Sequence, residues 1–508
     1  MLFSSSIFVF LFLPVLLAVY FGLRPGMRNI VLLCGSLFFY MWGEKLMVAL
    51  LFTSILSNYV FGLWIDAAHK KHDARLAVGV AVAFNVGVLV LFKYGDWLWS
   101  IVSWVAISLG LRENPFPDIS TLVTLGDPWR AVFFTPEGHI RLPLGISFFT
   151  FQALSYVLDV YRREAHVQRN LINFALYKSL FPQLIAGPIV RYKHVADQLV
   201  HRTVTRADFA LGVRRFIIGL GKKMLIANVV AKVVDGIFGA PGANIAGVPP
   251  LEVTPSLAWL ATVCYTLQIY FDFSGYSDMA IGLGHMFGFS FLENFNYPYI
   301  ARSITEFWRR WHISLSTWFR DYLYIPLGGN RVRPARTYLN LIIVFFLCGL
   351  WHGASFNFVV WGLYHGAFLV IERVGLGRWL DARGPIIRHV YVLLVVMVGW
   401  VFFRAPDLGT ALVYLKAMVG LQAGSPLLYH PDLYLDSVVI TAMIAGCIGS
   451  IPWLQRAKVW YAGLEQRGAA RLQLGVDIAA LCSLMLVFFC SALELSAGTY
   501  NPFIYFRF

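Results

Sequence analysis

Residues 340–371 read NLIIVFFLCGLWHGASFNFVVWGLYHGAFLVI, and this stretch contains no Asp, Glu, Lys or Arg. An apolar run of this length exceeds the roughly 20 residues that an α-helix needs to span a bilayer. His352 and His365 nevertheless lie inside it. Ionisable side chains within membrane segments are costly to bury and usually face a cavity or a partner. The stretch therefore predicts membrane helices and marks its histidines as candidate functional residues.

The composition of the whole chain agrees with this interpretation. Of its 508 residues, 58% are hydrophobic and 13% are charged, whereas roughly 25% of residues are charged in typical soluble domains. Apolar segments recur from one end to the other, and no long polar linker divides them. The sequence predicts an all-α polytopic membrane protein with about 11–13 membrane segments. We expect one integral membrane domain over residues 1–508.

The expected membrane helices follow from the positions of the apolar segments. The clearest segments are 6–23, 46–65, 76–92, 142–161, 256–271, 337–350, 356–371, 390–403, 437–451 and 474–490. Shorter or charged pieces at 30–42 and 216–234 are expected to be tilted, re-entrant or buried against other helices. Arg24 and Arg28 follow the first segment, and a basic loop at 456–471 precedes the last. Cytoplasmic loops are enriched in Lys and Arg, so both termini are expected on the outer side of the membrane.

The net charge of +14 is concentrated in short basic clusters, for example at 69–75, 161–163, 191–193, 215–223 and 300–336. Such clusters orient membrane proteins and attract anionic lipids. A second interpretation is a basic vestibule that attracts a phosphate-bearing donor. The two interpretations are compatible, and we retain both. Nothing in the pattern indicates a nucleic-acid partner.

The six cysteines all lie in apolar segments, and no two have CxxC spacing. This distribution argues against a disulfide framework or a metal site. Cys348 lies four residues before His352, which would place both on one face of a continuous helix. A Cys–His nucleophile pair is one interpretation. Small buried cysteines are ordinary packing residues, however, and we favour that role for Cys348.

The chemically richest stretch precedes the opening one and reads YIARSITEFWRRWHISLSTWFRDYLYIPLGGNR, residues 299–331. Wound as one helix over 303–322, it presents a largely aromatic face made of Trp308, Trp311, His312, Leu315 and Phe319. Arginines on the opposite face complete the pattern of an amphipathic helix at the membrane interface. His312 is then either a core histidine bonded to a backbone carbonyl or a functional residue.

The two histidines of the opening stretch are interpreted differently. His352 lies near the middle of an uncharged run, which favours a functional role over a structural one. His365 lies in the same run within LYHGAF, and we interpret it as a structural residue that contacts another helix.

Three of these stretches resemble the membrane-bound O-acyltransferase (MBOAT) family. They are YFDFSGYSDMAIGLG (270–284), SITEFWRRWHISLSTWFRDYLYIPLGGNR (303–331) and GLWHGAS (349–355), and the motif core is residues 256–372. The likeness covers nearly the whole chain and is greatest to the bacterial branch that acetylates polysaccharides. It implies a ring of tilted helices around a central tunnel. His352 matches the family's catalytic histidine, and His312 matches its second polar position.

The resemblance also implies an activity. Members of this branch move an acyl group from a cytoplasmic thioester across the inner membrane, and a periplasmic SGNH-type acetyltransferase commonly completes transfer to the polymer. We therefore expect an inner-membrane O-acetyltransferase with acetyl-CoA or another acyl thioester as donor, without a permanently bound cofactor or metal. Its expected partners are the SGNH-type enzyme and a polysaccharide synthesis and secretion complex. Relatives act on alginate, cellulose and other glycans, so the polymer stays open.

Two alternatives from other classes remain at this point. The first is a transporter of polysaccharide or lipid-linked sugar, with the histidines in a proton relay. Transporters often contain internal repeats, and the sequence has none. The second alternative is a non-catalytic membrane subunit that anchors a secretion complex.

Elementary chemistry agrees with acyl transfer. Coenzyme A carries several phosphate charges that hydrocarbon would exclude, whereas an acetyl group is small and neutral. A histidine can take a hydroxyl proton and return it to the leaving thiolate. The tetrahedral oxyanion needs a hydrogen-bond donor. Protonated His312, a Trp N–H or backbone N–H groups are the candidates for that donor.

The final residues, NPFIYFRF (501–508), have two interpretations. Aromatic residues and an arginine are typical of a membrane-interface anchor. The tail also resembles the aromatic C-terminus of the small membrane peptide that serves the related teichoic-acid D-alanylation system. That resemblance implies that Tyr505 accepts the acyl group on its phenol and relays it outward.

Overall fold

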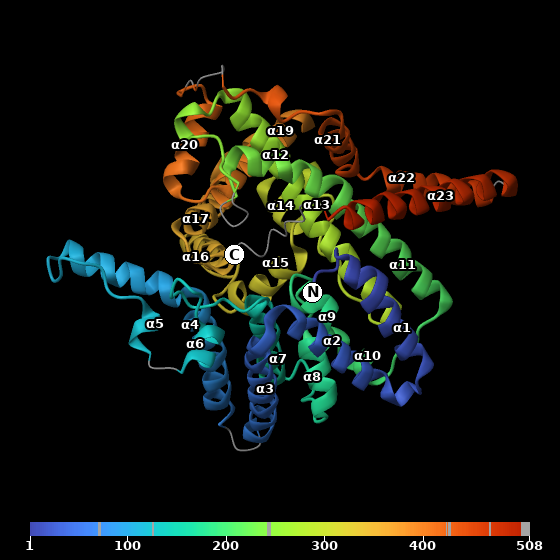
Figure 1. The fold of residues 1–508 in the computed structure, drawn as a ribbon, viewed down its shortest axis with the longest axis horizontal. Helices are drawn as coiled ribbons and strands as arrows, with labels where there is room; N and C mark the ends of the chain where they lie inside the picture. Colours follow the sequence, from blue (N-terminus) through green and yellow to red (C-terminus); the bar gives the residue numbers. More distant parts are fainter. Residues whose placement is uncertain are drawn as a thin grey trace. The chain divides into compact units, whose positions relative to one another are not determined.

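The computed structural model describes residues 1–69, 73–123, 126–240, 245–422, 424, 428–466 and 469–498. Within these ranges the chain is helical and forms no β-strand, only isolated bridges between Phe134 and Ile140 and between Ala240 and Ile245 (Figure 1). The predicted all-α fold class is confirmed. The chain divides into two compact units, residues 1–204 with 287–291 and residues 205–286 with 292–508. The single domain over 1–508 stays a prediction.

The described residues of the first unit begin with a π-helical turn at Phe8–Phe12 and continue through ten helices (Figure 1). These are α1 (Leu13–Gly22), α2 (Arg28–Glu44), α3 (Val48–His69), α4 (Ala74–Ser108), α5 (Ile119–Leu122), α6 (Asp127–Phe133), α7 (Ile146–Arg162), α8 (Leu171–Ser179), α9 (Phe181–Leu184) and α10 (Tyr192–Val200). Phe3, Phe8 and Phe39 pack around Phe181 with ring centroids 5.4–6.1 Å from it, so aromatic contacts form part of this unit's core.

The second unit contains the motif core. Its helices are α11 (Arg206–Gly221), α12 (Asn228–Phe238), α13 (Pro255–Phe287), α14 (Ile304–Arg310), α15 (Ile313–Phe319), α16 (Pro334–His352), α17 (Phe356–Ile371), α18 (Gly377–Asp381), α19 (Pro385–Arg404), α20 (Leu408–Met418), α21 (Ser437–Gly449), α22 (Trp453–Gln466) and α23 (Ala470–Ser496). π-helical turns at Lys222–Ala227, Arg320–Tyr324 and Glu372–Leu376 extend α11, α15 and α17.

Several helices of the described chain are long and apolar enough to cross a membrane. Six runs meet this test: Pro25–His69, Ala74–Ser108, Pro334–His352, Phe356–Asp381, Pro385–Arg404 and Ala470–Ser496. The bent pair Ser437–Gly449 and Trp453–Leu464 makes a seventh if it is one span. Other expected segments form helices that are shorter or more polar than the test requires. The protein is therefore a multi-pass membrane protein, with fewer helices of full spanning character than the 11–13 expected segments.

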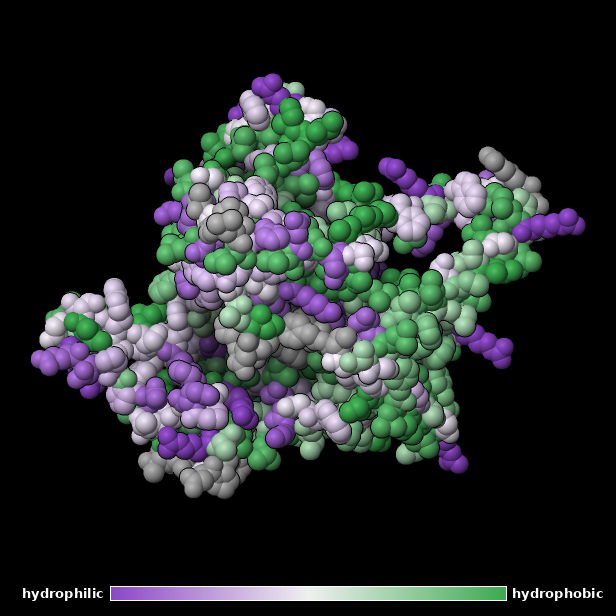
Figure 2. Space-filling model, turned by 45° about the horizontal axis from the view of Figure 1, so that its top comes forward, coloured by the Kyte–Doolittle hydropathy of each residue, from purple (hydrophilic) through white to green (hydrophobic). Residues whose placement is uncertain are grey.

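The surface has the apolar character that lipid contact requires. Large hydrophobic side chains such as Phe10, Trp104 and Leu486 are more than half exposed, and Figure 2 shows broad hydrophobic areas on the face in view. In water, contiguous exposed areas of this kind would drive association. In a bilayer the same side chains contact lipid hydrocarbon chains, which are equally apolar.

Helix α13 packs against α11 through paired glycines. A Cβ atom on Gly212 would lie 2.6 Å from the backbone oxygen of Gly282, and one on Gly219 would lie 2.5 Å from that of Gly275. The two glycines of each helix are seven residues apart, so both contacts fall on the same helix face. Small residues allow this close approach of backbones in membranes. Gly282 thus serves the packing of α13 against α11.

Helices α16 and α17 form a second close pair. A Cβ atom on Gly349 would collide with the backbone oxygen of Phe358, and one on Gly362 would collide with that of Phe345. The two glycines also face each other, since the Cβ position of Gly362 lies 3.1 Å from the Cα atom of Gly349. This contact fixes the end of α16, where His352 lies, against α17.

The glycine contact between α11 and α13 leads to the first prediction. Gly219→Ala places a methyl group against backbone atoms that cannot rotate away, so we expect it to destabilise the protein by about 1–3 kcal/mol. The control is Gly475→Ala in α23, because no atom lies within 4 Å of that Cβ position. Thermal unfolding of the purified protein in detergent measures both. Equal melting temperatures for the two variants would contradict the close contact.

Candidate active site

His352 is the last residue of α16, and its side chain is only 5% exposed. Aromatic rings surround it, with Trp351, Trp361 and Phe403 at centroid distances of 4.8, 5.0 and 5.1 Å. Gly353 follows in an extended conformation and ends the helix. His352 thus lies at the end of a helix, among indole and phenyl rings.

His312 occupies a break between two helices, so the prediction of one helix over 303–322 is wrong. Helix α14 ends at Arg310 and α15 begins at Ile313. His312 lies between them with φ 44° and ψ 55°, in the left-handed region that a residue with a Cβ rarely adopts. Backbone strain of this kind is found preferentially at functional sites.

A short segment preceding α14 causes the break. The N–H of Asn296 donates to the carbonyl of Arg310, and the N–H of Ile313 donates to the carbonyl of Asn294. These two bonds take the place of hydrogen bonds that a continuous helix would make within itself. The helical periodicity of the sequence is compatible with both arrangements, so only the tertiary contacts decide between them.

Asn294 also holds the His312 side chain. The Nδ1 atom of His312 lies 3.1 Å from the Oδ1 atom of Asn294, and both side chains are 1% exposed. A structural His312 is expected to bond to a backbone carbonyl. Its partner is instead the side-chain amide of Asn294. On its other side the His312 ring packs edge-on against Phe273 of α13, with centroids 4.6 Å apart.

Trp351 brings the two predicted site histidines together. Its ring lies 5.8 Å from the His312 ring and 4.8 Å from the His352 ring, measured between centroids. The two imidazoles therefore contact the same indole, and their centroids cannot be farther apart than the sum of these two distances. Two residues that are 40 positions apart in the sequence thus share one buried aromatic environment.

His365 lies in α17 and is completely buried. Its ring contacts Trp308 and Trp361 at 5.2 Å each, and its Nε2 atom faces Gly399 of α19. Neither ring nitrogen has a hydrogen-bond partner among the described residues. These contacts place His365 at the packing contact between α17 and α19, in agreement with the structural role expected for it.

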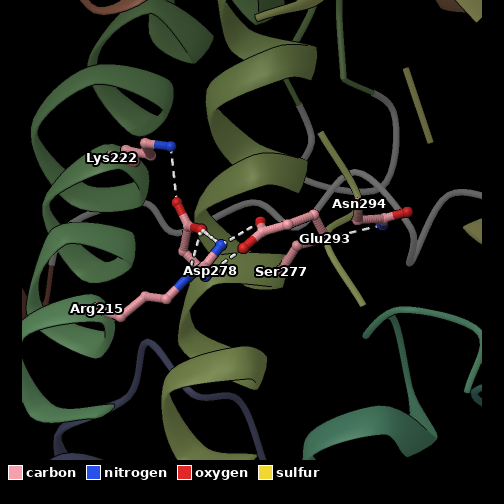
Figure 3. A network of polar contacts seen from close by, with 6 residues as sticks. All are labelled: Arg215, Lys222, Ser277, Asp278, Glu293 and Asn294. Carbon is pink, nitrogen blue, oxygen red and sulfur yellow. Dashed lines mark hydrogen bonds and ion pairs between the residues drawn. The ribbon is translucent and has the colours of Figure 1, made fainter. Parts of the chain in front are cut away.

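Ion pairs attach α13 to α11 and to the segment that carries Asn294. Asp278 of α13 pairs with Lys222 at 2.7 Å and with Arg215 at 2.9 Å, and Arg215 also binds Glu293 (Figure 3). Next to this network Asn294 donates to the hydroxyl oxygen of Ser277 at 3.1 Å. Adjacent residues of α13 thus hold adjacent residues of the segment before α14.

A further ion pair joins the same two helical segments and is buried. Lys223 and Asp272 lie 2.7 Å apart, with side chains 2% and 1% exposed. Removing one partner of such a pair leaves an uncompensated buried charge, which is strongly destabilising. We interpret this pair as structural. Within the described residues no three His, Cys, Asp or Glu side chains are placed to hold a metal ion.

Two predicted features of the site have different outcomes. Cys348 is buried one turn before His352, as expected for a packing residue. Tyr505 lies outside the described residues, so its role stays a prediction. No sequence pattern indicated Asn294, Ser277 or Trp351 as site residues. Asn294 lies 18 residues before His312, and no local periodicity connects the two positions.

The fold defines the general class, an all-α multi-pass membrane protein with histidines buried in its helical core. Residues 97–403 match the membrane-bound O-acyltransferase (MBOAT) family. The chain belongs to this family and is an acyltransferase. This membership favours the enzyme over the transporter and the non-catalytic subunit considered from the sequence.

Curated relatives match between 46% and 100% of the chain. It is 40% identical to the probable alginate O-acetylase AlgI of Azotobacter vinelandii, with 100% of both chains covered. It is 35% identical to the peptidoglycan O-acetyltransferase of Helicobacter pylori over 84% of this chain and 81% of that protein. It is 29% identical to the teichoic acid D-alanyltransferase of Bacillus subtilis over 46% of this chain and 60% of that protein.

The different surroundings of the histidines give the second prediction. His365→Leu removes no hydrogen bond within the described residues, so we expect a stability change below about 1.5 kcal/mol. Acyltransferase activity should fall less than tenfold, whereas loss of a general base costs about 10²–10⁴-fold. Melting temperature and activity of the purified variant measure both effects. A loss of activity as large as that of His352→Ala would assign His365 to the chemistry.

Proposed function

We propose that this acyltransferase moves an acetyl group from acetyl-CoA on the cytoplasmic side of the inner membrane, for O-acetylation of an extracellular polysaccharide. The observation that carries the proposal is that the buried His312 and His352 both contact Trp351, in a chain with full-length similarity to an alginate O-acetylase. Relatives that are named for alginate, peptidoglycan and teichoic acid support a polymer as the final acceptor.

His352 is the proposed general base. It takes the proton of the accepting hydroxyl while that oxygen bonds to the thioester carbon. The tetrahedral intermediate then expels the thiolate by breaking the C–S bond, and the thiolate takes the proton back from His352. Burial among aromatic rings keeps water from competing with the acceptor. The surroundings of His352, formed by Trp361 and Phe403, support this assignment.

The basic segment from the end of α14 to the first turn of α16 is the proposed contact for the phosphates of coenzyme A. It contains four exposed arginines, Arg309, Arg331, Arg333 and Arg336. None of these four makes an ion pair within the described part of the chain. Unpaired guanidinium groups are suited to bind phosphate in bidentate geometry. The acetyl group then enters the membrane while the charged carrier stays at its surface.

The remaining assignments follow from the family. The proposed partners are a periplasmic SGNH-type acetyltransferase and the polysaccharide synthesis and secretion complex. We place the protein in the inner membrane with both termini in the periplasm, because basic loops follow the first expected segment and precede the last. The family match at residues 97–403 includes parts of both compact units, in line with one catalytic domain.

The third prediction tests the function in cells. A His352→Ala strain should secrete polymer at the normal level but without acetyl esters, because secretion of the polysaccharide is a separate process. Ester content and polymer mass of the secreted material are measured, with protein abundance checked by immunoblot. His365→Leu is the matched control and should keep its esters. Normal ester content in the His352→Ala strain would refute the proposal.

Tyr505 is the proposed acyl relay at the outer side. A phenol with pKa near 10 is a better leaving group than a sugar alcohol, so an aryl ester can pass the acetyl group onward. In that step the phenol oxygen bonds to the acetyl carbon while its proton moves to His352, the C–S bond of the thioester breaks, and the leaving thiolate takes the proton from His352. The acceptor's hydroxyl oxygen later bonds to the acetyl carbon, the aryl ester C–O bond breaks, and the proton of that hydroxyl returns to the phenol oxygen.

The fourth prediction separates this relay from membrane anchoring. Tyr505→Phe keeps the aromatic ring and removes only the oxygen, so it should abolish polymer acetylation while protein abundance stays normal. Tyr500→Phe, one residue before this tail, is the control and should have no effect. Acetylation that persists in the Tyr505→Phe strain would leave the tail as an anchor and the transfer direct.

A further inference from the structure

The hydrogen bonds of Asn294 fix the orientation of its side-chain amide. The backbone N–H of Ser314 donates to its Oδ1 atom at 3.2 Å, and the Ser314 hydroxyl donates to the same atom at 2.9 Å. A backbone N–H can only donate, so the atom that it contacts must be the amide oxygen and not the nitrogen. The amide nitrogen then points to Ser277, to which it donates at 3.1 Å.

This orientation determines where the proton of His312 lies. The Nδ1 atom of His312 is 3.1 Å from Oδ1 of Asn294, and an amide oxygen can only accept. Nδ1 must therefore carry the hydrogen. A neutral imidazole has a single N–H, so its Nε2 atom is left with a bare lone pair. That Nε2 atom is buried and has no hydrogen-bond partner among the described residues.

We propose that Asn294 is a positioning residue that holds His312 in the Nδ1–H tautomer, with Nε2 available as an acceptor inside the acyl-transfer site. This inference rests on the proposed function. It assigns to neutral His312 the role of a hydrogen-bond or proton acceptor. In the neutral form Nε2 accepts a hydrogen bond or a proton from a reacting hydroxyl or thiol. It cannot donate to the oxyanion, so that task falls to another donor, such as an indole or backbone N–H.

The surroundings of Asn294 are built to keep it in place. Arg215 joins Glu293 to Asp278, one residue along the chain from the contact between Asn294 and Ser277 (Figure 3). The segment is therefore fastened to α13 at two consecutive residues. At the other end His312 is held by the backbone bonds across the helix break. An imidazole fixed at both its backbone and Nδ1 has little freedom to change tautomer or orientation.

The direct test is nitrogen NMR of the purified full-length protein labelled with ¹⁵N-histidine. Protonated and bare ring nitrogens resonate in separate regions, and the signals of His312 are those absent from His312→Ala. We expect a protonated Nδ1 and a bare Nε2 in the wild type and in Asn294→Asp, which keeps the accepting oxygen. Asn294→Leu should lose this preference. A protonated Nε2 in the wild type, or an unchanged tautomer in Asn294→Leu, would overturn the proposal.

Turnover gives the functional counterpart, measured as release of free thiol from acetyl-CoA. Asn294→Leu should lower the rate by about 10- to 100-fold, as is typical when the partner that orients a functional imidazole is removed. Asn294→Asp should recover most of the rate. Asn296→Ala, an exposed position in the same segment, is the control and should match the wild type. Equal rates for Asn294→Leu and Asn296→Ala would contradict a positioning role.

The two measurements separate this inference from the proposed function. If the wild type released no thiol from acetyl-CoA, the proposed donor would be wrong, yet the tautomer of His312 would still be measured. If Asn294→Leu failed to fold, which size-exclusion chromatography would reveal, the wild type and Asn294→Asp would still decide the tautomer.

Discussion

Close contact between the backbones of α11 and α13 is the constraint on which the rest of the motif core depends. Only glycine at Gly212, Gly219, Gly275 and Gly282 allows the two helices to approach this far. At that separation short acidic side chains on α13 meet basic side chains on α11 and its π-helical extension. The side chains on this face of α13 then hold the segment before α14 in place. The position of an imidazole thus derives from a packing contact between glycines.

Burial in an apolar core makes this chain of contacts strict. An amide or imidazole away from water needs partners of defined geometry, because solvent cannot complete its hydrogen bonds. Asn294 satisfies the requirement with donors from Ser314 and His312 on one side and an acceptor on the other. Its role requires both an acceptor and a donor at a fixed separation, which few side chains provide.

The sequence predicted the class of the molecule well because hydropathy depends on composition over whole segments. The membrane helices and the family both followed from such patterns and motifs. The helix over 303–322 failed for a physical reason, since residues 294–296 supply hydrogen bonds that interrupt it. Helical periodicity records which residues are apolar, and both a broken and a continuous helix can satisfy it. The partners of His312 depend on contacts distant in sequence, which no local pattern contains.

The contact of both site histidines with Trp351 has a consequence for how protons move within the protein. An indole offers one N–H and no accepting lone pair, so it cannot take up a proton from one group and pass it to another. Trp351 therefore cannot act as a proton relay between the two imidazoles, although it contacts both. A proton that passes between them must travel through a direct contact or through another polar group.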